Sequence, residues 1–248
     1  MKLLPALLFI FTGLQIAASD HDLQAKAIDK NNSWQVIFRD NFKNLKNWWI
    51  EGGQSVTVKN GKLYVKADPA TFDKGKNGGV CTVWNKIPVS GNIKIDFDVC
   101  VISSKTNVNN INLFLFFSDP AGTDLQSSAD ARKSADYPLY HNLNGYIFTY
   151  LNDAQKRGPV NIDGSTKARF RIRRCPGFNL LTQTYGYHAE KNKIYHISII
   201  RRDKILSIAV DGKIYLKASD ETPFKSGYWG FRTFRTYLWF GQVTVSKI

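Results

Sequence analysis

The sequence contains 248 residues, enough for one large domain or two small ones, and its 43% hydrophobic content excludes a disordered chain. No linker-like stretch divides it, so we expect a single domain over residues 20–248. The formal net charge of +14 favours polyanionic partners, although solubility alone would also explain it.

Residues 1–19 have the pattern of a secretory signal peptide. Lys2 precedes an apolar run over residues 3–11, and the small residues Ala17, Ala18 and Ser19 follow. The run is too short to span a bilayer, and no later segment is long enough. We therefore predict cleavage near Ala18 or Ser19 and export to the bacterial periplasm or the extracellular space, without a membrane span.

Short alternating or apolar segments separated by turn signals fill the rest of the chain. Residues 40–53 carry aromatic side chains and are expected to form a plug rather than a long helix, and Asn60-Gly61 and Asp211-Gly212 predict tight hairpin turns. About fourteen short strands without a sustained helical period predict an all-β sandwich or barrel, with the last strand beside the first. Apart from a cysteine-bearing hairpin, the predicted strands cover residues 34–39, 55–59, 62–67, 112–118, 145–151, 169–174, 179–185, 194–201, 205–210, 213–218, 228–233 and 238–246.

Two of the three cysteines lie in segments that predict a hairpin. A turn near Ser90-Gly91 would place Cys81 opposite Cys100 on neighbouring strands. Facing cysteines in such a pair are close enough for a disulfide. The sequence therefore predicts that Cys81 and Cys100 are neighbours and leaves their oxidation state open.

The segment from Ile111 to Leu151 is organised differently from the rest. An apolar strand opens it and an aromatic strand closes it, with a long polar stretch between them. An insertion of this length between sheet strands is more often a binding or catalytic loop than a simple connection. We expect a ligand site where this loop meets the arginine-rich strand over residues 169–174.

Several motifs resemble a known family. The segments LFLFFSDPAGTDL, YHNLNGYIFTYLN and ARFRIRRCPGFNLLTQ are similar to the YesU-like family, and the two ends of the chain resemble concanavalin-A-like or laminin-G-like domains. The resemblance implies a two-sheet antiparallel jelly-roll sandwich and a role in the degradation of pectin-like polysaccharides. It places recurrent family positions at Asp124, Tyr140, His141, Tyr146, Tyr150, Arg171 and Arg173.

Three arginines alternate along one predicted strand. Arg169, Arg171 and Arg173 share one face, and guanidinium groups grip carboxylates bidentately. They would bind uronates or sulfated sugars, together with Asp124 and Tyr150. Alternatively, they form a solvated face or pair with acidic neighbours such as Asp96 and Asp98.

His141 is the candidate catalytic base. A neutral imidazole beside Tyr140 and Tyr146 could remove the proton next to a uronate carboxylate, as a lyase requires, while an arginine neutralises that carboxylate. Alternatively, His141 fixes its loop through a hydrogen bond to the backbone.

Carboxylates offer weaker candidates. Asp96 and Asp98 share a strand face and could act as a glycosidase pair, but exposed aspartates paired with lysines explain them too. Asp119 and Asp124 could bind Ca²⁺ or simply shape a turn. We expect no cofactor and no other metal.

The sequence thus favours an exported protein that binds or acts on an anionic polysaccharide or oligosaccharide. It could be a glycoside hydrolase, a polysaccharide lyase, a lectin-like binding protein or an interaction protein of the envelope. Export and the absence of a recognised module disfavour nucleic acid as a partner. The oligomeric state is left open.

Overall fold

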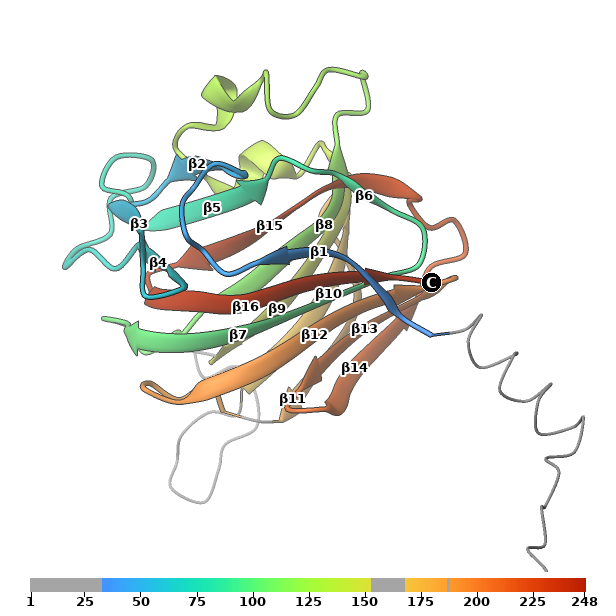
Figure 1. Ribbon diagram of the computed structural model, residues 1–248. Coiled ribbons are helices and arrows are strands. Elements are labelled where there is room, and N and C mark those ends of the chain that lie inside the picture. Colours follow the sequence, from blue (N-terminus) through green and yellow to red (C-terminus); the bar gives the residue numbers. More distant parts are fainter. Residues whose placement is uncertain (1–32, 153–167, 187) are drawn as a thin grey trace, which may run out of the picture. The chain divides into compact units, whose positions relative to one another are not determined.

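Two antiparallel β-sheets pack against each other in the computed structural model, which describes residues 33–152, 168–186 and 188–248 (Figure 1). The predicted signal peptide lies outside the described residues. Two short 3₁₀ helices, η1 (Ala129–Arg132) and η2 (Tyr137–Tyr140), interrupt the strand order. The strands are β1 (Gln35–Asp40), β2 (Trp48–Gly52), β3 (Ser55–Lys59), β4 (Lys62–Lys66), β5 (Val80–Asn85), β6 (Val89–Ser90), β7 (Ile93–Ser103), β8 (Ile111–Ser118), β9 (Asn144–Asn152), β10 (Ala168–Cys175), β11 (Asn179–Gly186), β12 (Ile194–Arg202), β13 (Ile205–Val210), β14 (Lys213–Ser219), β15 (Ser226–Phe234) and β16 (Tyr237–Lys247).

Each sheet has eight strands. Sheet A has the order β14-β13-β12-β7-β16-β4-β3, with β1 also paired to β16. Sheet B has the order β11-β10-β9-β8-β15-β5-β2, with β6 also paired to β15. In Figure 1 the strands β16, β7 and β12 of sheet A lie in front of β8, β9 and β10 of sheet B. The predicted all-β, two-sheet class is confirmed.

The turn predictions and the pairing of the chain ends are also confirmed. Asn60-Gly61 joins β3 to β4 and Asp211-Gly212 joins β13 to β14, and all four of these residues have positive φ angles, as such tight turns require. The strands β1 and β16 run antiparallel, with Gln35 opposite Lys247.

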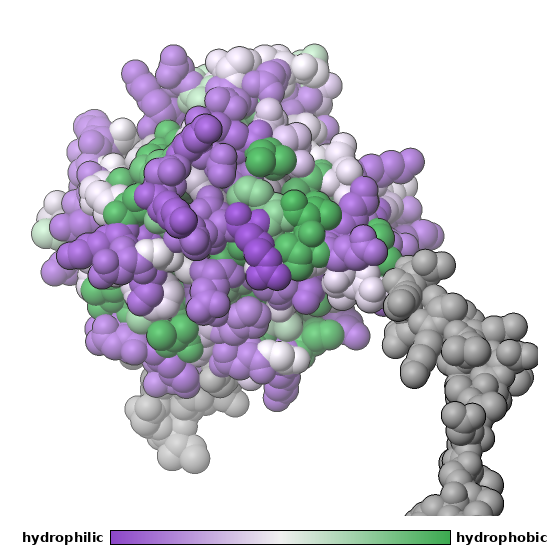
Figure 2. All heavy atoms as spheres, viewed as in Figure 1, coloured by the Kyte–Doolittle hydropathy of each residue, from purple (hydrophilic) through white to green (hydrophobic). Residues whose placement is uncertain are grey.

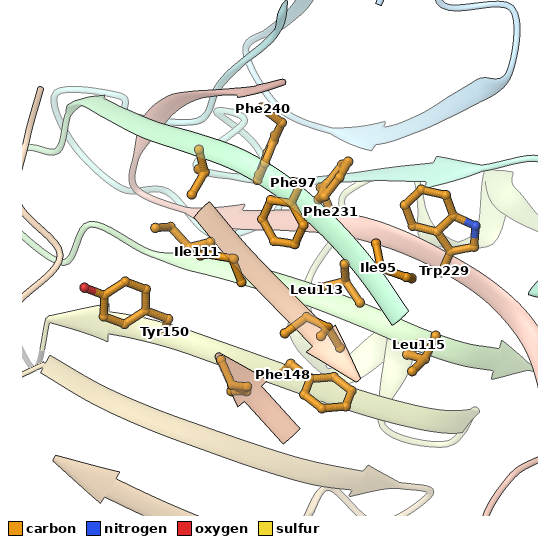
Figure 3. Packing of buried hydrophobic residues seen from close by; sticks show 14 of the residues in the cluster. Ile95, Phe97, Ile111, Leu113, Leu115, Phe148, Tyr150, Trp229, Phe231 and Phe240 are labelled. Atoms are coloured by element: carbon orange, nitrogen blue, oxygen red, sulfur yellow. The ribbon is translucent and has the colours of Figure 1, made fainter. Parts of the chain in front are cut away.

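The core lies between the sheets and is built from alternating side chains. Ile95 and Phe97 of β7 point into it and meet Leu113, Phe148 and Phe231 from sheet B (Figure 3). The Phe97 and Phe231 rings meet edge to face with centroids 5.0 Å apart. Burial of one face of each sheet fixes the register, because a slip of one residue would turn these side chains to solvent.

The predicted cysteine hairpin is wrong. The strand β5, which carries Cys81, pairs with β15 and β2, whereas β7, which carries Cys100, pairs with β12 and β16. Between them β6 pairs with β15, and the chain then crosses to the other sheet rather than reversing at Ser90-Gly91. Cys81 points into the core from sheet B, Cys100 lies on the outer side of sheet A, and both are free thiols.

The expected aromatic plug contains a strand. The strand β2 forms the edge of sheet B and places Trp49 opposite Trp84 and Glu51 opposite Thr82. Trp48 points into the core, while Glu51 on the opposite face is only 1% exposed. The sequence did not indicate a strand here because two adjacent tryptophans mask the alternation.

Figure 2 shows the molecule from the direction of sheet A. Hydrophilic side chains cover most of this face, and hydrophobic side chains lie between them in small groups.

Candidate functional site

The alternation of β10 points its three arginines away from the core. Phe170 and Ile172 are fully buried between the sheets, so Arg169, Arg171 and Arg173 occupy the outer face of sheet B. Their neighbours on β9 are Leu151, Thr149 and Ile147. The predicted common face of the arginines is therefore present.

These arginines line a groove of about 940 Å³ on the outer face of sheet B. Its floor comes from β8, β9, β10 and β15, and its walls come from the 68–79 loop and from η2. Among the described residues the lining contains one carboxylate, that of Asp136. The basic lining side chains are Lys74, Arg169, Arg171, Arg173, Arg232 and Arg235, and the aromatic ones are Phe72, Tyr137, Phe178 and Phe234.

His141 is one of the residues that line this groove. Its ring stacks on Phe178 with centroids 4.1 Å apart and meets the Tyr137 ring edge to face at 5.3 Å. Nε2 is buried without a hydrogen-bond partner among the described residues. Burial lowers the pKa of His141, and the positive charges of Arg232 and Arg173 lower it further, which keeps the imidazole neutral.

Tyr140 does not share the groove with its neighbour His141. It is fully buried and packs against Trp84 and Phe114, and its hydroxyl donates a hydrogen bond to Glu51 Oε2 at 2.6 Å. The expected catalytic pair of His141 and Tyr140 is therefore not assembled. The single turn of η2 directs the Tyr140 ring into the sheet and leaves Tyr137 in the groove.

Glu51 organises the contacts beneath the loop between β8 and β9. Its Oε1 atom lies 3.0 Å from Arg132 Nη2 and 3.1 Å from Arg132 Nε, while Oε2 accepts hydrogen bonds from Trp84 Nε1 at 3.0 Å and from Tyr140. Arg132 also donates to the Ser128 and Leu125 carbonyls. This buried ion pair holds the loop against the edge strand β2.

Tyr146 and Tyr150 face the core, opposite to the expected direction. The Tyr146 hydroxyl donates to Asp220 Oδ2 at 2.6 Å, and burial raises its pKa. The Tyr150 ring stacks on Phe170 at 4.6 Å. Because Thr149 and Leu151 of β9 line the groove, Tyr150 between them must point to the other side of the sheet, and so must Tyr146, which shares its face with Tyr150 by alternation.

Asp124 lies outside the groove lining. It is exposed, and its Oδ1 accepts a hydrogen bond from the Tyr228 hydroxyl at 2.7 Å. This bond, followed by the one from the Ser127 amide, lowers the pKa of Asp124. Asp124 therefore shapes the loop and does not line this groove.

Asp96 and Asp98 belong to sheet A. Asp96 pairs with Lys94 at 3.0 Å and Asp98 contacts His196 Nδ1 at 2.9 Å. They are too remote in the fold to neutralise the arginines of β10, which lie on the outer face of the other sheet. Asp119 Oδ1 accepts a hydrogen bond from the Ala121 amide, and the described ranges contain no cluster of three His, Cys, Asp or Glu side chains suited to a metal.

The sequence did not single out Arg232, Tyr137 or Phe178, which complete the groove. Alternation in β15 could have predicted the position of Arg232. Phe231 enters the core, so the adjacent Arg232 must point outward. Tyr137 and Phe178 are placed by the turns at η2 and after β10, which local patterns do not specify. Arg173 lies over the Phe178 ring, 4.4 Å from its centroid.

The fold is that of galectin-like jelly rolls. A protein of unknown function with a galectin-like fold from Bacillus subtilis is 16% identical, with a TM-score of 0.67 over 86% of this chain and 97% of that chain. The carbohydrate-binding module CBM66 from Bacillus subtilis is 14% identical, with a TM-score of 0.54 over 82% and 98%. An endo-beta-1,3-glucanase from Pyrococcus furiosus is 12% identical, with a TM-score of 0.55 over 86% and 94%.

The chain belongs to the family described as domain of unknown function DUF6250, whose model matches residues 75–242. This match does not confirm the YesU-like assignment. No curated protein matches the chain. No helix in the described part of the chain is long and apolar enough to cross a membrane.

Proposed function

We propose that this protein binds an anionic, uronate-containing polysaccharide or oligosaccharide of the pectin type in the groove on sheet B. The observation that carries the proposal is the composition of the lining, where six basic side chains stand against one carboxylate among the described residues. Planar guanidinium groups bind carboxylates through paired hydrogen bonds. Aromatic rings beside them offer flat surfaces to the apolar faces of sugar rings.

The burial of a basic side chain in the groove supports a role of its charge in ligand binding rather than in solubility alone. Arg232 is only 3% exposed, so it is not part of a solvated outer face. Withdrawing cations from water is unfavourable unless an anion or a hydrogen-bonding group offsets the loss. A polyanion lying along the groove would supply that offset.

The relatives in fold support a carbohydrate as the ligand. One neighbour is by its name a carbohydrate-binding module and another a glucanase. The proposal includes export of the protein. Lys2 followed by an apolar run has the pattern of a signal peptide, and polysaccharides of this kind occur outside the cytoplasm. Binding without catalysis is the primary proposal, because the expected tyrosine partner of His141 is buried in the core.

A lyase is the second candidate function, and His141 is the observation that favours it. Its lowered pKa leaves it neutral, as a general base requires, and the Tyr137 ring lies beside it in the groove. Arg173 or Arg232 would neutralise the substrate carboxylate. Unsaturated product from polygalacturonate that is lost in His141→Ala and Tyr137→Phe would establish this activity.

Titration calorimetry with oligogalacturonates tests the primary proposal. Binding should weaken as salt is added and as the carboxylates are methyl-esterified, and Arg171→Gln should reduce it. Arg202→Gln, which removes an exposed arginine at the end of β12 in sheet A, is the matched control and should bind normally. Equal affinity for the charged and esterified oligosaccharides would contradict the proposal.

A further inference from the structure

Arg232 is held in the floor of the groove by neutral groups. It extends from β15, and its Nη1 donates hydrogen bonds of 2.8 Å to Thr82 Oγ1 and to the Ala135 carbonyl oxygen. Its guanidinium lies 4.6 Å from the centroid of the Tyr137 ring and 5.0 Å from that of the Tyr140 ring. The side chain is therefore fixed in position before any ligand arrives.

No carboxylate in the described part of the chain forms an ion pair with this guanidinium. Glu51, the buried carboxylate beneath the same loop, is already paired with Arg132 at 3.0 Å and hydrogen-bonded to Tyr140 and Trp84. Asp136 lines the groove but makes no ion pair with Arg232. A buried cation without an anion is unfavourable, so the charge of Arg232 lowers the stability of the folded protein.

Two neighbouring side chains of the groove lining each have polar atoms without a hydrogen-bond partner among the described residues. Nε and Nη2 of Arg232 make no hydrogen bond to the described residues. Asn112 lies directly opposite Arg232 across the β8–β15 pair and also lines the groove. Its Nδ2 donates to Asn110 Oδ1 at 2.6 Å, while its Oδ1 is buried and accepts no hydrogen bond within the described ranges.

We propose that Arg232 and Asn112 form a subsite for one carboxylate and an adjacent hydroxyl of the ligand, which is the pattern of a uronic acid residue. The Nε and Nη2 edge of Arg232 would hold both carboxylate oxygens, and Asn112 Oδ1 would accept a hydrogen bond from the hydroxyl. This inference rests on the proposed function and assigns its specificity to two residues. A lysine has the same charge but lacks the planar fork, so it would not replace Arg232.

The test compares variants by calorimetry with galacturonate oligosaccharides, their methyl esters and sulfated galactan oligosaccharides. Arg232→Lys should weaken binding of the galacturonate at least about tenfold and reduce its preference over the sulfated ligand. Asn112→Leu should weaken galacturonate binding without changing that preference. Arg202→Lys, which makes the same exchange on sheet A, should bind like the original protein.

The outcomes separate this subsite from the proposed function. If the original protein binds none of these ligands, the proposed function fails. If it binds galacturonate and loses affinity in Arg171→Gln but not in Arg232→Lys, the groove binds the ligand and the subsite is refuted.

A measurement without ligand adds a second criterion. Because lysine keeps the positive charge and a hydrogen-bond donor, Arg232→Lys should leave the melting temperature of the free protein nearly unchanged, and galacturonate should raise that temperature less in the variant than in the original protein. A large drop in the melting temperature of the free variant would assign Arg232 a purely structural role and overturn the proposal.

Discussion

Replacing Glu51 with glutamine should destabilise the protein strongly, because this carboxylate is the only partner that balances the buried charge of Arg132 among the described residues. Both side chains are almost fully withdrawn from solvent, at 1% and 6% exposure. Glutamine keeps the shape and one acceptor oxygen but removes the charge. Leaving one member of a buried pair uncompensated costs about 3–5 kcal/mol, so we expect Glu51→Gln to lower the free energy of unfolding by that amount.

A double variant tests whether the loss comes from the ion pair. In Glu51→Leu with Arg132→Met, both charges disappear, and the donors left without their acceptor are the Tyr140 hydroxyl and the Nε1 groups of Trp49 and Trp84. Buried donors without a partner cost about 1–3 kcal/mol each. The double variant should therefore lose less stability than the sum of the two single variants.

Urea-induced unfolding followed by tryptophan fluorescence measures both effects, since Trp49 and Trp84 donate hydrogen bonds to Glu51 and report on its surroundings. A loss below about 1 kcal/mol for Glu51→Gln, or strict additivity in the double variant, would refute the reasoning.

Three further predictions follow from described contacts. Tyr146→Phe removes the hydrogen bond to Asp220 and should cost about 1–3 kcal/mol of stability in urea unfolding, while the affinity for galacturonate stays unchanged; a selective loss of affinity would return Tyr146 to the site. The lowered pKa of His141 means that the unfolded chain takes up its proton first as the pH falls through about 6.5, so stability should decline there, and His141→Gln should flatten that decline in unfolding measured at successive pH values. The three thiols should be free and unreactive toward Ellman's reagent until the protein unfolds, because all are buried and burial raises the pKa of Cys81 to about 12; a Cys81–Cys100 disulfide found by mass spectrometry would contradict their placement in opposite sheets.

Much of the fold could be predicted from the sequence because its signals are local. Strand alternation in β10, β13 and β16 and the turn dipeptides at Asn60 and Asp211 act within a few residues. The cysteine hairpin failed because the choice between a hairpin and a crossing to the other sheet depends on which partner offers the better pairing. In the structure β15 pairs with β5 and β6, and the sequence of residues 81–100 contains no signal that identifies β15 as the partner.

Strand periodicity predicted which residues of a strand share a face. It did not predict whether that face points into the core or into the groove. Alternation correctly placed Arg169, Arg171 and Arg173 on one face. The same alternation applied to β9 would have sent Tyr146 and Tyr150 into the core, had the pairing between β9 and β10 been known. The groove walls come from loops, whose course depends on buried contacts such as that of Glu51 with Arg132 rather than on a repeating pattern.

The ion pair beneath the β8–β9 loop has a consequence for how binding preferences can change. The loop leaves and rejoins the sheet on neighbouring strands, and one buried anchor pins it to β2. The strands supply most of the positive charge of the groove, whereas this loop supplies one of its walls. Under the proposed function, charge selection and shape selection are thus encoded in separate stretches of chain, so a relative that keeps the arginines and the anchor could exchange the loop and bind a different anionic sugar.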